Sequence, residues 1–231
     1  GGRFLLLGSG EFQPWVGATE IAAMADARGD GSVAIFTTAS APEGEAVFQR
    51  WNSMGLAHYA SLHLPARLIE VRSRVDADDR ENARAARAAS LVFFSGGNPR
   101  YLRETLAETR LLTAIEEMLA AGGVYAGCSA GAMVAGAQLP TGRGLARFAW
   151  GQGLGLVRGH VFGVHWDAAM MRPFRAVVAG RVPPDFQFLG IAERTAVLSS
   201  DQGWLVSGEG DVEQRGVQGR RRYRAGETIS Y

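Results

Sequence analysis

Short apolar runs alternate with helix-like stretches along residues 4–126, and this alternation is the feature that most constrains the fold. The runs are too short for helices and are bounded by Gly, Ser or Pro, as buried parallel strands are. They cover residues 4–7, 33–36, 68–71, 91–94 and 124–126. Helical patterns fill the intervals at residues 18–28, 44–54, 78–88 and 109–121. The pattern predicts a doubly wound, mostly parallel α/β sheet.

The pattern changes after residue 140, where glycine-rich segments precede one expected helix at residues 168–179. Short strands are expected afterwards, at 195–198 and 204–206, and we expect them to be extra C-terminal strands of the same domain. A chain of 231 residues with 47% hydrophobic content is long enough to bury one large core. We therefore expect a single domain over residues 1–231.

All 24 basic side chains are arginine, and the chain contains no lysine. A Schiff-base lysine, a serine–lysine dyad and a Gly-Lys-Ser/Thr phosphate loop are therefore excluded. The 23 acidic residues are mixed with the arginines and leave a net charge of +1, so neither nucleic acid nor an anionic membrane is an expected partner. The one basic cluster, residues 220–224, is expected to be a solvated strand or turn.

Cofactor and metal signatures are also missing from the sequence. Cys128 is the one cysteine, which excludes an internal disulfide and a multi-cysteine metal site. Gly8-Ser9-Gly10 lacks the third glycine of a dinucleotide fingerprint.

Residues 118–142 carry no charge, but they hold too many glycines and too few large aliphatic side chains for a membrane helix. We expect no cofactor, no metal and a cytoplasmic location.

Gly127-Cys128-Ser129-Ala130-Gly131 follows an apolar strand and precedes a helical segment, which is the context of a nucleophile elbow. The glycines allow the tight turn that lifts the Ser129 hydroxyl above the sheet, and the Ala130 N–H can face a developing oxyanion. Gly96 or Gly97, after the preceding strand, can supply a second N–H. Cys128 is the competing nucleophile, but its position in the turn favours a small buried side chain.

The general base has four candidates, of which His165 is preferred because it closes an expected strand at residues 161–164. His160 is expected at the other end of that strand, and the remaining two, His58 and His63, are interpreted as packing or surface residues. No Asp or Glu lies between Ser129 and His165, so the order serine, acid, histidine of an α/β-hydrolase esterase is not available. Glu193 is the first choice for the acid, and Asp167 is the alternative.

These motifs together resemble the peptidase E (aspartyl dipeptidase) and cyanophycinase family of serine peptidases. The resemblance rests on residues 94–98, residues 127–132, the segment around His165 and residues 189–193. It implies a flavodoxin-like fold, related to class I glutamine amidotransferase domains, with a small peptide or amide as substrate. A homodimer is one assembly that the chain allows. By the same resemblance Ser129 is the nucleophile, His165 the base, Glu193 the acid, and Gly97 and Ala130 form the oxyanion hole.

The resemblance also implies which residues hold the substrate. Family substrates carry aspartyl groups, and basic residues after the histidine help to hold a carboxylate. Arg172 and Arg175 match that position. Asn98, which directly follows Gly96 and Gly97, is expected to contact substrate as well. The stretch from His165 to Arg172 is shorter than in peptidase E. The leading hypothesis is a serine-type peptidase, and the alternative is an amidotransferase-like binding or regulatory domain that has lost peptidase activity.

Overall fold

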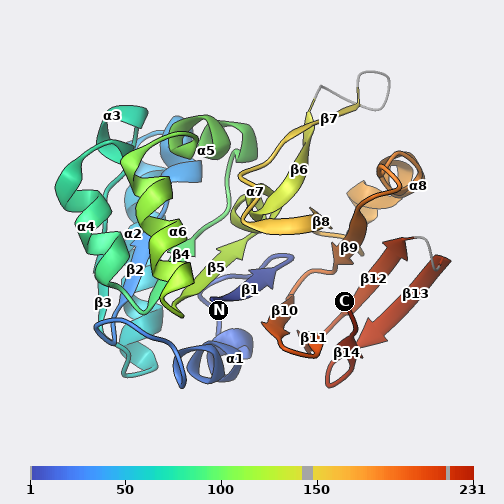
Figure 1. Ribbon diagram of the computed structural model, residues 1–231, viewed down its shortest axis with the longest axis horizontal. Helices are drawn as coiled ribbons and strands as arrows, with labels where there is room; N and C mark the ends of the chain where they lie inside the picture. Colours follow the sequence, from blue (N-terminus) through green and yellow to red (C-terminus); the bar gives the residue numbers. More distant parts are fainter. Residues whose placement is uncertain (1, 142–147, 217–218) are drawn as a thin grey trace.

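The structure is a computed structural model that describes residues 2–141, 148–216 and 219–231. Within these residues the strands form two sheets (Figure 1). The large sheet has eight strands in the order β14-β11-β10-β1-β5-β4-β2-β3. The small sheet has six strands in the order β13-β12-β9-β8-β6-β7. The expected α/β class is confirmed, whereas the second sheet was not foreseen.

The parallel part of the large sheet is built from the apolar runs of the N-terminal half. Its strands are β1 (Arg3–Leu7), β2 (Val33–Phe36), β3 (Ala66–Leu68), β4 (Leu91–Phe94) and β5 (Val124–Cys128). Three antiparallel strands extend it beyond β1, namely β10 (Thr195–Ser200), β11 (Gly203–Gly208) and β14 (Thr228–Ile229). The strand expected at 68–71 lies at Ala66–Leu68 instead, because the pairing with β2 runs from Ala66 to Leu68.

Helices cover both faces of the large sheet. One face carries α1 (Pro14–Met24) and α2 (Glu45–Ser61), and the other carries α3 (Arg74–Ala77), α4 (Arg80–Ala88), α5 (Pro99–Leu106), α6 (Arg110–Ala120) and α7 (Ala130–Ala135). The side chains of Asp79, Asn98 and Thr109 cap α4, α5 and α6 by accepting backbone N–H bonds. The helix expected at 18–28 starts earlier because Pro14 occupies its first turn.

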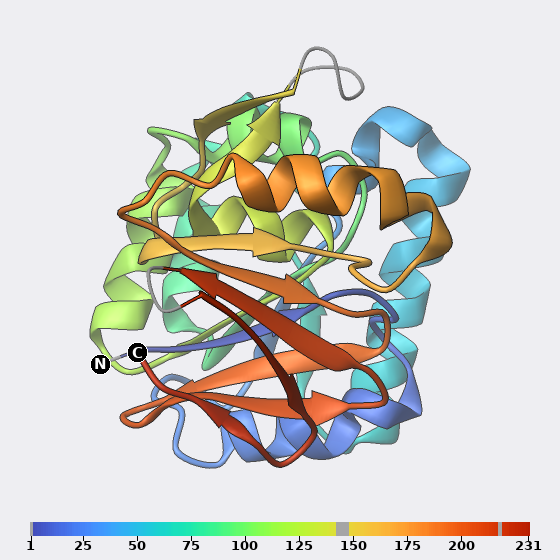
Figure 2. The ribbon, with the colours of Figure 1, turned by 90° about the vertical axis from the view of Figure 1, so that its right-hand side faces the viewer.

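The small sheet comes from the glycine-rich half of the chain. Its strands are β6 (Gly136–Thr141), β7 (Ala149–Gln152), β8 (Val157–Gly163), β9 (Gln187–Ile191), β12 (Asp211–Gly216) and β13 (Gly219–Arg224). Strands β6, β8 and β9 are parallel, and the others pair antiparallel. The turn η3 (Ala169–Met171) leads into α8 (Arg172–Gly180), which lies across this sheet (Figure 2). Val178 of α8 packs with Val161 and Phe188 there.

The face of the small sheet opposite α8 shares a core with the large sheet. One apolar cluster contains Leu6 and Phe94 of the large sheet together with Phe162 and Leu189 of the small one, all fully buried. Because this core is continuous, we propose that the two sheets form one domain. No helix in the described ranges has the length and apolar character needed to cross a membrane.

Candidate active site

The carboxyl ends of parallel strands from both sheets meet at one place. Ser129 follows β5, and the loops after β4 and β1 lie beside it, since β1 and β4 are the two neighbours of β5. His165 and Glu193 follow β8 and β9, which are adjacent and parallel in the small sheet. Sites of α/β proteins lie where parallel strands end. The topology therefore gathers the predicted residues from segments far apart in sequence.

Ser129 stands at the turn between β5 and α7 with φ of 49° and ψ of −106°, a conformation that costs energy for a residue with a side chain. The two glycines of the motif make this turn possible. A Cβ atom on Gly127 would lie 2.5 Å from the Gly131 carbonyl, and one on Gly131 would lie 2.2 Å from the Phe94 oxygen. The Ser129 N–H donates to the Leu7 carbonyl over 3.0 Å, which fixes the turn to β1. A strained serine between a strand and a helix is what the elbow interpretation of this motif requires.

His165 lies two residues beyond β8, and its ring faces Ser129. Its Nε2 atom is 3.1 Å from the Ser129 Oγ, and its backbone N–H donates to the Gly8 carbonyl over 3.3 Å. The expected position of His160 at the end of the strand was wrong, because β8 starts at Val157 and His160 lies inside it. There the His160 Nε2 accepts a bond from the Trp204 indole, and burial lowers the pKa of the imidazole.

Glu193 approaches the other side of the imidazole. Its Oε1 atom is 3.1 Å from the His165 Nδ1, so the hydrogen bonds fit the tautomer with a proton on Nδ1 and a lone pair toward Ser129. Asp167, the alternative acid, bonds elsewhere: its Oδ1 accepts the Glu193 backbone N–H over 2.6 Å. Asp167 therefore supports Glu193 rather than contacting the ring.

The expected oxyanion donors are the N–H groups of Gly97, in the loop after β4, and of Ala130, at the start of α7. The Gly96 N–H is taken, because it donates to the Glu11 carboxylate over 2.8 Å. The Gly97 N–H donates to no acceptor among the described residues, and Ala130 is the first residue of α7, where N–H groups have no intrahelical acceptor. Gly97 has φ of +140°, and a Cβ there would lie 2.4 Å from Ala39. Glycine is therefore required at this position.

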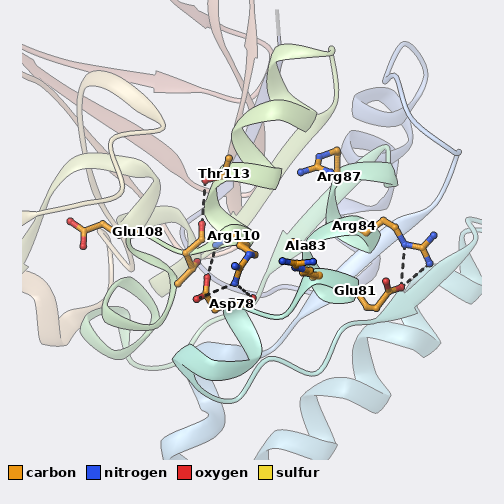
Figure 3. Close-up of a pocket in the computed structure, with 10 residues that line it drawn as sticks. Asp78, Glu81, Ala83, Arg84, Arg87, Glu108, Arg110 and Thr113 are labelled. Carbon is orange, nitrogen blue, oxygen red and sulfur yellow. Dashed lines mark hydrogen bonds and ion pairs between the residues drawn. The ribbon is translucent and has the colours of Figure 1, made fainter.

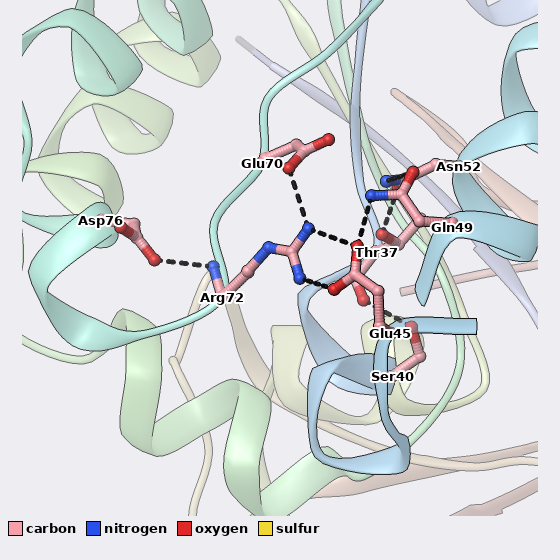
Figure 4. A network of polar contacts seen from close by, with 8 residues as sticks. All are labelled: Thr37, Ser40, Glu45, Gln49, Asn52, Glu70, Arg72 and Asp76. Atoms are coloured by element: carbon pink, nitrogen blue, oxygen red, sulfur yellow. Dashed lines mark hydrogen bonds and ion pairs between the residues drawn. The ribbon is translucent and has the colours of Figure 1, made fainter. Parts of the chain in front are cut away.

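A polar network lies near the segment that contains Ala39, the neighbour of Gly97 (Figure 4). The guanidinium of Arg72 bonds Glu45 at the start of α2 and Glu70, and it lies 4.2 Å from the centroid of the Phe48 ring. The hydrogen bond from Arg72 lowers the pKa of Glu45 to about 2. These contacts join the start of α2 to the segment after β3, and the 3-10 helix η1 (Thr38–Glu43), which contains Ala39, directly precedes α2.

Cys128 is fully buried beneath the elbow and makes a poor nucleophile. Its thiol donates to Glu11 Oε2 over 3.0 Å. Burial, and then the charge of Glu11, raise the pKa of the thiol, so the reactive thiolate is disfavoured. The geometry thus favours Ser129, whose side chain is only partly buried, over its neighbour.

The residues expected to hold substrate lie at different places. The Asn98 side chain caps α5 by accepting the Tyr101 N–H over 3.0 Å, and its backbone N–H bonds Ala39. Arg172 is exposed at the start of α8. Arg175 lines a pocket of about 550 Å³ next to Asp167, together with the turn between β11 and β12 and part of β13. The structure therefore places Arg175 in one pocket with Asp167, which supports Glu193.

The pocket in Figure 3 is unrelated to this site. It has a volume of about 690 Å³, is lined by residues of α4, of α6 and of the segment before α6, and contains none of the predicted site residues. Three of its arginines already have partners, since Arg84 pairs with Glu81, Arg87 with Glu117 and Arg110 with Asp78. In the part of the chain that the structure describes, no cluster of His, Cys, Asp and Glu is arranged to hold a metal ion.

The loop after β1 was missed by the sequence reasoning, which judged residues 8–10 only as an incomplete nucleotide motif. Gly8 accepts the His165 N–H, and Ser9 Oγ accepts the Arg194 N–H over 3.2 Å. Glu11 bonds both Cys128 and Gly96, and Gly96 lies in the loop of residues 95–98 after β4, which we call the oxyanion loop. The available signal was position, because this loop follows the strand next to β5 and must end beside the elbow.

A serine in the turn between a strand and a helix, hydrogen-bonded to a histidine that also bonds a glutamate, is an arrangement typical of hydrolases of serine type. Comparison with protein families makes this more specific. The model of peptidase family S51 matches residues 59–206, which is more than half of the chain. The chain belongs to peptidase family S51, and the resemblance to peptidase E is confirmed.

Two solved structures are similar to the chain. A peptidase from an acI-B1 actinobacterium shares 29% sequence identity with a TM-score of 0.91, over 100% of this chain and 97% of that one. A putative peptidase E protein from Listeria monocytogenes EGD-e shares 18% identity with a TM-score of 0.66, over 90% of this chain and 99% of that one. No curated protein matches the chain. The second similarity supports the fold alone.

Proposed function

We propose that the chain hydrolyses an amide bond in short peptides through an acyl-enzyme formed on Ser129. Family membership supports a serine peptidase. The observation that carries the assignment of residues is the continuous series from Ser129 Oγ through the His165 ring to Glu193 Oε1, with both distances 3.1 Å. This is the arrangement in which a histidine accepts the serine proton while a carboxylate holds its tautomer.

The reaction follows from these contacts in two halves. Ser129 Oγ attacks the carbonyl carbon of the substrate and its proton passes to His165 Nε2, while Glu193 stabilises the imidazolium. The Gly97 and Ala130 N–H groups stabilise the negative oxygen of the tetrahedral intermediate. The C–N bond then breaks, and the leaving amine takes the proton from His165. A water molecule attacks the acyl-enzyme with His165 again as base, which releases the acid and restores Ser129.

For the substrate, we propose a peptide that carries a carboxylate, of the aspartyl type that the family resemblance implies. Arg175 supports this because it lines the pocket next to Asp167, and its buried Nε atom has no hydrogen-bond partner among the described residues. Asp211 and Glu209 also line the pocket, and each already has a cationic partner, namely Arg222 and Arg194 respectively. A planar, permanently charged guanidinium can bind a carboxylate through two hydrogen bonds. Arg172 and Asn98 are proposed as further contacts.

The test uses aspartyl dipeptides and a fluorophosphonate probe on the intact protein and on Ser129→Ala. We expect the parent to hydrolyse at least one dipeptide and to be labelled at Ser129. The variant should lose both properties and keep the unfolding temperature of the parent within a few degrees, because the change removes a single oxygen. Undiminished turnover by Ser129→Ala would refute the assignment of the nucleophile. A parent that neither cleaves nor reacts with the probe would favour the binding-domain alternative.

A further inference from the structure

Glu11 is a buried carboxyl group in the loop after β1, and only 6% of the residue is exposed. A buried carboxyl group costs free energy unless its oxygens are hydrogen-bonded, so its presence needs a structural reason. The steps of the reaction described above do not use it. Both of its oxygens are nevertheless engaged at the centre of the site, one by Gly96 and one by Cys128.

The backbone on either side of Glu11 lies in the left-handed region of φ, which glycine adopts readily but which costs energy at Phe12. Gly10 has φ of 75° and Phe12 has φ of 59°. The Trp15 indole donates to the Gly10 carbonyl over 2.7 Å, and the Phe12 ring packs against Phe93 with ring centroids 4.9 Å apart. Such conformations persist only where the surroundings determine them. The carboxyl group of Glu11 is therefore presented from a rigid support.

The carboxyl group joins two loops that end different strands. Its Oε1 accepts the Gly96 N–H over 2.8 Å, and its Oε2 accepts the Cys128 thiol over 3.0 Å. Gly96 belongs to the loop after β4, whereas Cys128 ends β5 and directly precedes Ser129. A Cβ atom on Gly96 would lie 3.4 Å from the Ser129 Cβ, so the two loops are in close approach. Glu11 thus fixes the distance between the oxyanion loop and the nucleophile.

The bond to Gly96 also determines which amide faces the substrate. The Gly96 N–H turns inward to Glu11, and the next amide, that of Gly97, is left without an acceptor among the described residues. Without Glu11 the Gly96 N–H would be a buried donor lacking its partner, and the flexible glycine pair could rotate to satisfy it. The Gly97 N–H would then leave the position that a tetrahedral intermediate requires.

We propose that Glu11 is a positioning residue for the oxyanion hole, acting through Gly96 on the Gly97 amide. This inference rests on the proposed function, in which Ser129 is the nucleophile and Gly97 an oxyanion donor. It predicts that loss of the Glu11 acceptor slows the chemical step and leaves substrate binding unchanged. A misplacement of about 1 Å in a catalytic group can lower a rate by about 100-fold. We therefore expect kcat to fall by about 10- to 100-fold.

The test compares Glu11→Met with Glu11→Gln in the full chain. Methionine fills the space but accepts hydrogen bonds only weakly, whereas glutamine keeps one carbonyl oxygen for Gly96 without the negative charge. Each variant is assayed for kcat and KM on the dipeptide that the parent cleaves, and for its rate of labelling by a fluorophosphonate. In that labelling the Ser129 Oγ–P bond forms, fluoride leaves and the serine proton passes to His165. The phosphonyl oxygen occupies the oxyanion hole.

We expect the methionine variant to lose kcat and labelling rate together at an unchanged KM, and the glutamine variant to stay within about threefold of the parent. Hydrogen exchange of the Gly96 amide should accelerate in Glu11→Met only. Glu20→Gln is the matched control, since Glu20 is a buried carboxyl that bonds the side chains of His58 and Tyr59. It should lower the unfolding temperature without slowing the labelling. Glu11→Ala repeats the test if Glu11→Met does not fold.

Three results would overturn the positioning role of Glu11. The first is a labelling rate in Glu11→Met equal to that of the parent, and the second is a glutamine variant as slow as the methionine one. The third is a control variant that loses activity to the same extent as Glu11→Met. A parent that is itself neither labelled nor active would refute the proposed function as well, so the two failures are distinguishable.

Discussion

Replacing Glu193 by glutamine tests how strongly the carboxylate supports His165. The Glu193 Oε1 lies 3.1 Å from the His165 Nδ1, and the two side chains are 48% and 36% exposed. The change keeps the size of the side chain and removes the charge that stabilises the imidazolium in the transition state. Asp167 remains in place to hold the backbone of residue 193.

The magnitude follows from this distance and exposure. Two unit charges at this separation attract each other by about 1.3 kcal/mol in bulk water and about 5 kcal/mol at an effective dielectric constant of about 20. Water reaches both side chains, so the lower part of this range applies, at about 2 kcal/mol. That energy corresponds to a loss of about 30-fold in kcat. A buried carboxylate in a serine-protease triad is worth much more, about 10⁴-fold.

The assay is steady-state hydrolysis of the best dipeptide at pH 7.5, with Glu193→Ala beside Glu193→Gln to remove any wrong tautomer that the amide imposes. Asp167→Asn is the matched control, because asparagine keeps an oxygen that can accept the residue 193 N–H. We expect the control to retain most of the activity. A loss of less than about threefold in both Glu193 variants would transfer the role of the acid to Asp167. A loss of about 10⁴-fold would refute the argument from solvent exposure.

Two further predictions concern a buried histidine and the substrate pocket. His160 has a lowered pKa because it is buried, so the unfolded chain binds its proton first and stability should fall as pH decreases through about 6.5. His160→Phe should flatten the pH dependence of the free energy of unfolding, measured by urea denaturation at pH 7.5 and 5.5. At pH 7.5 the variant should lose about 1–3 kcal/mol of this free energy, because the Trp204 N–H loses its acceptor. An unchanged dependence on pH would contradict the role of His160. Arg175→Ala should raise KM for an aspartyl peptide by about 10- to 100-fold and leave KM for its alanyl analogue unchanged, with Arg175→Lys intermediate. An equal rise in KM for both peptides would show that Arg175 does not bind the aspartyl carboxylate of the substrate.

The sequence predicted the parts of the site that depend on local patterns. The elbow at Ser129 is recognisable because strand, turn and helix are contiguous, and the missing acid between Ser129 and His165 directed attention to Glu193. The eight-residue helix α5 was overlooked although Asn98 and Pro99 form a regular helix start. Here the signal was present and was not used.

Other features depend on pairing between distant segments and could not be predicted. The small sheet arises because β6, β8 and β9 pair in parallel, and nothing in their short glycine-rich sequences specifies those partners. His160 was misplaced for the same reason, since the start of β8 at Val157 is set by its pairing with Gly136. The role of Asp167 as support for Glu193 depends on the adjacency of β8 and β9.

The residues of the proposed site are divided between the two sheets, so catalysis at this site would depend on how the sheets pack together. Ser129 and Gly97 belong to the large sheet, whereas His165 and Glu193 are carried by the small one, and Phe162 and Leu189 lie in the core between them. A substitution in that core that shifts one sheet against the other would change the 3.1 Å contact between Ser129 and His165 without touching either residue. The residues that tune the rate of such an enzyme therefore include apolar side chains that never meet a substrate.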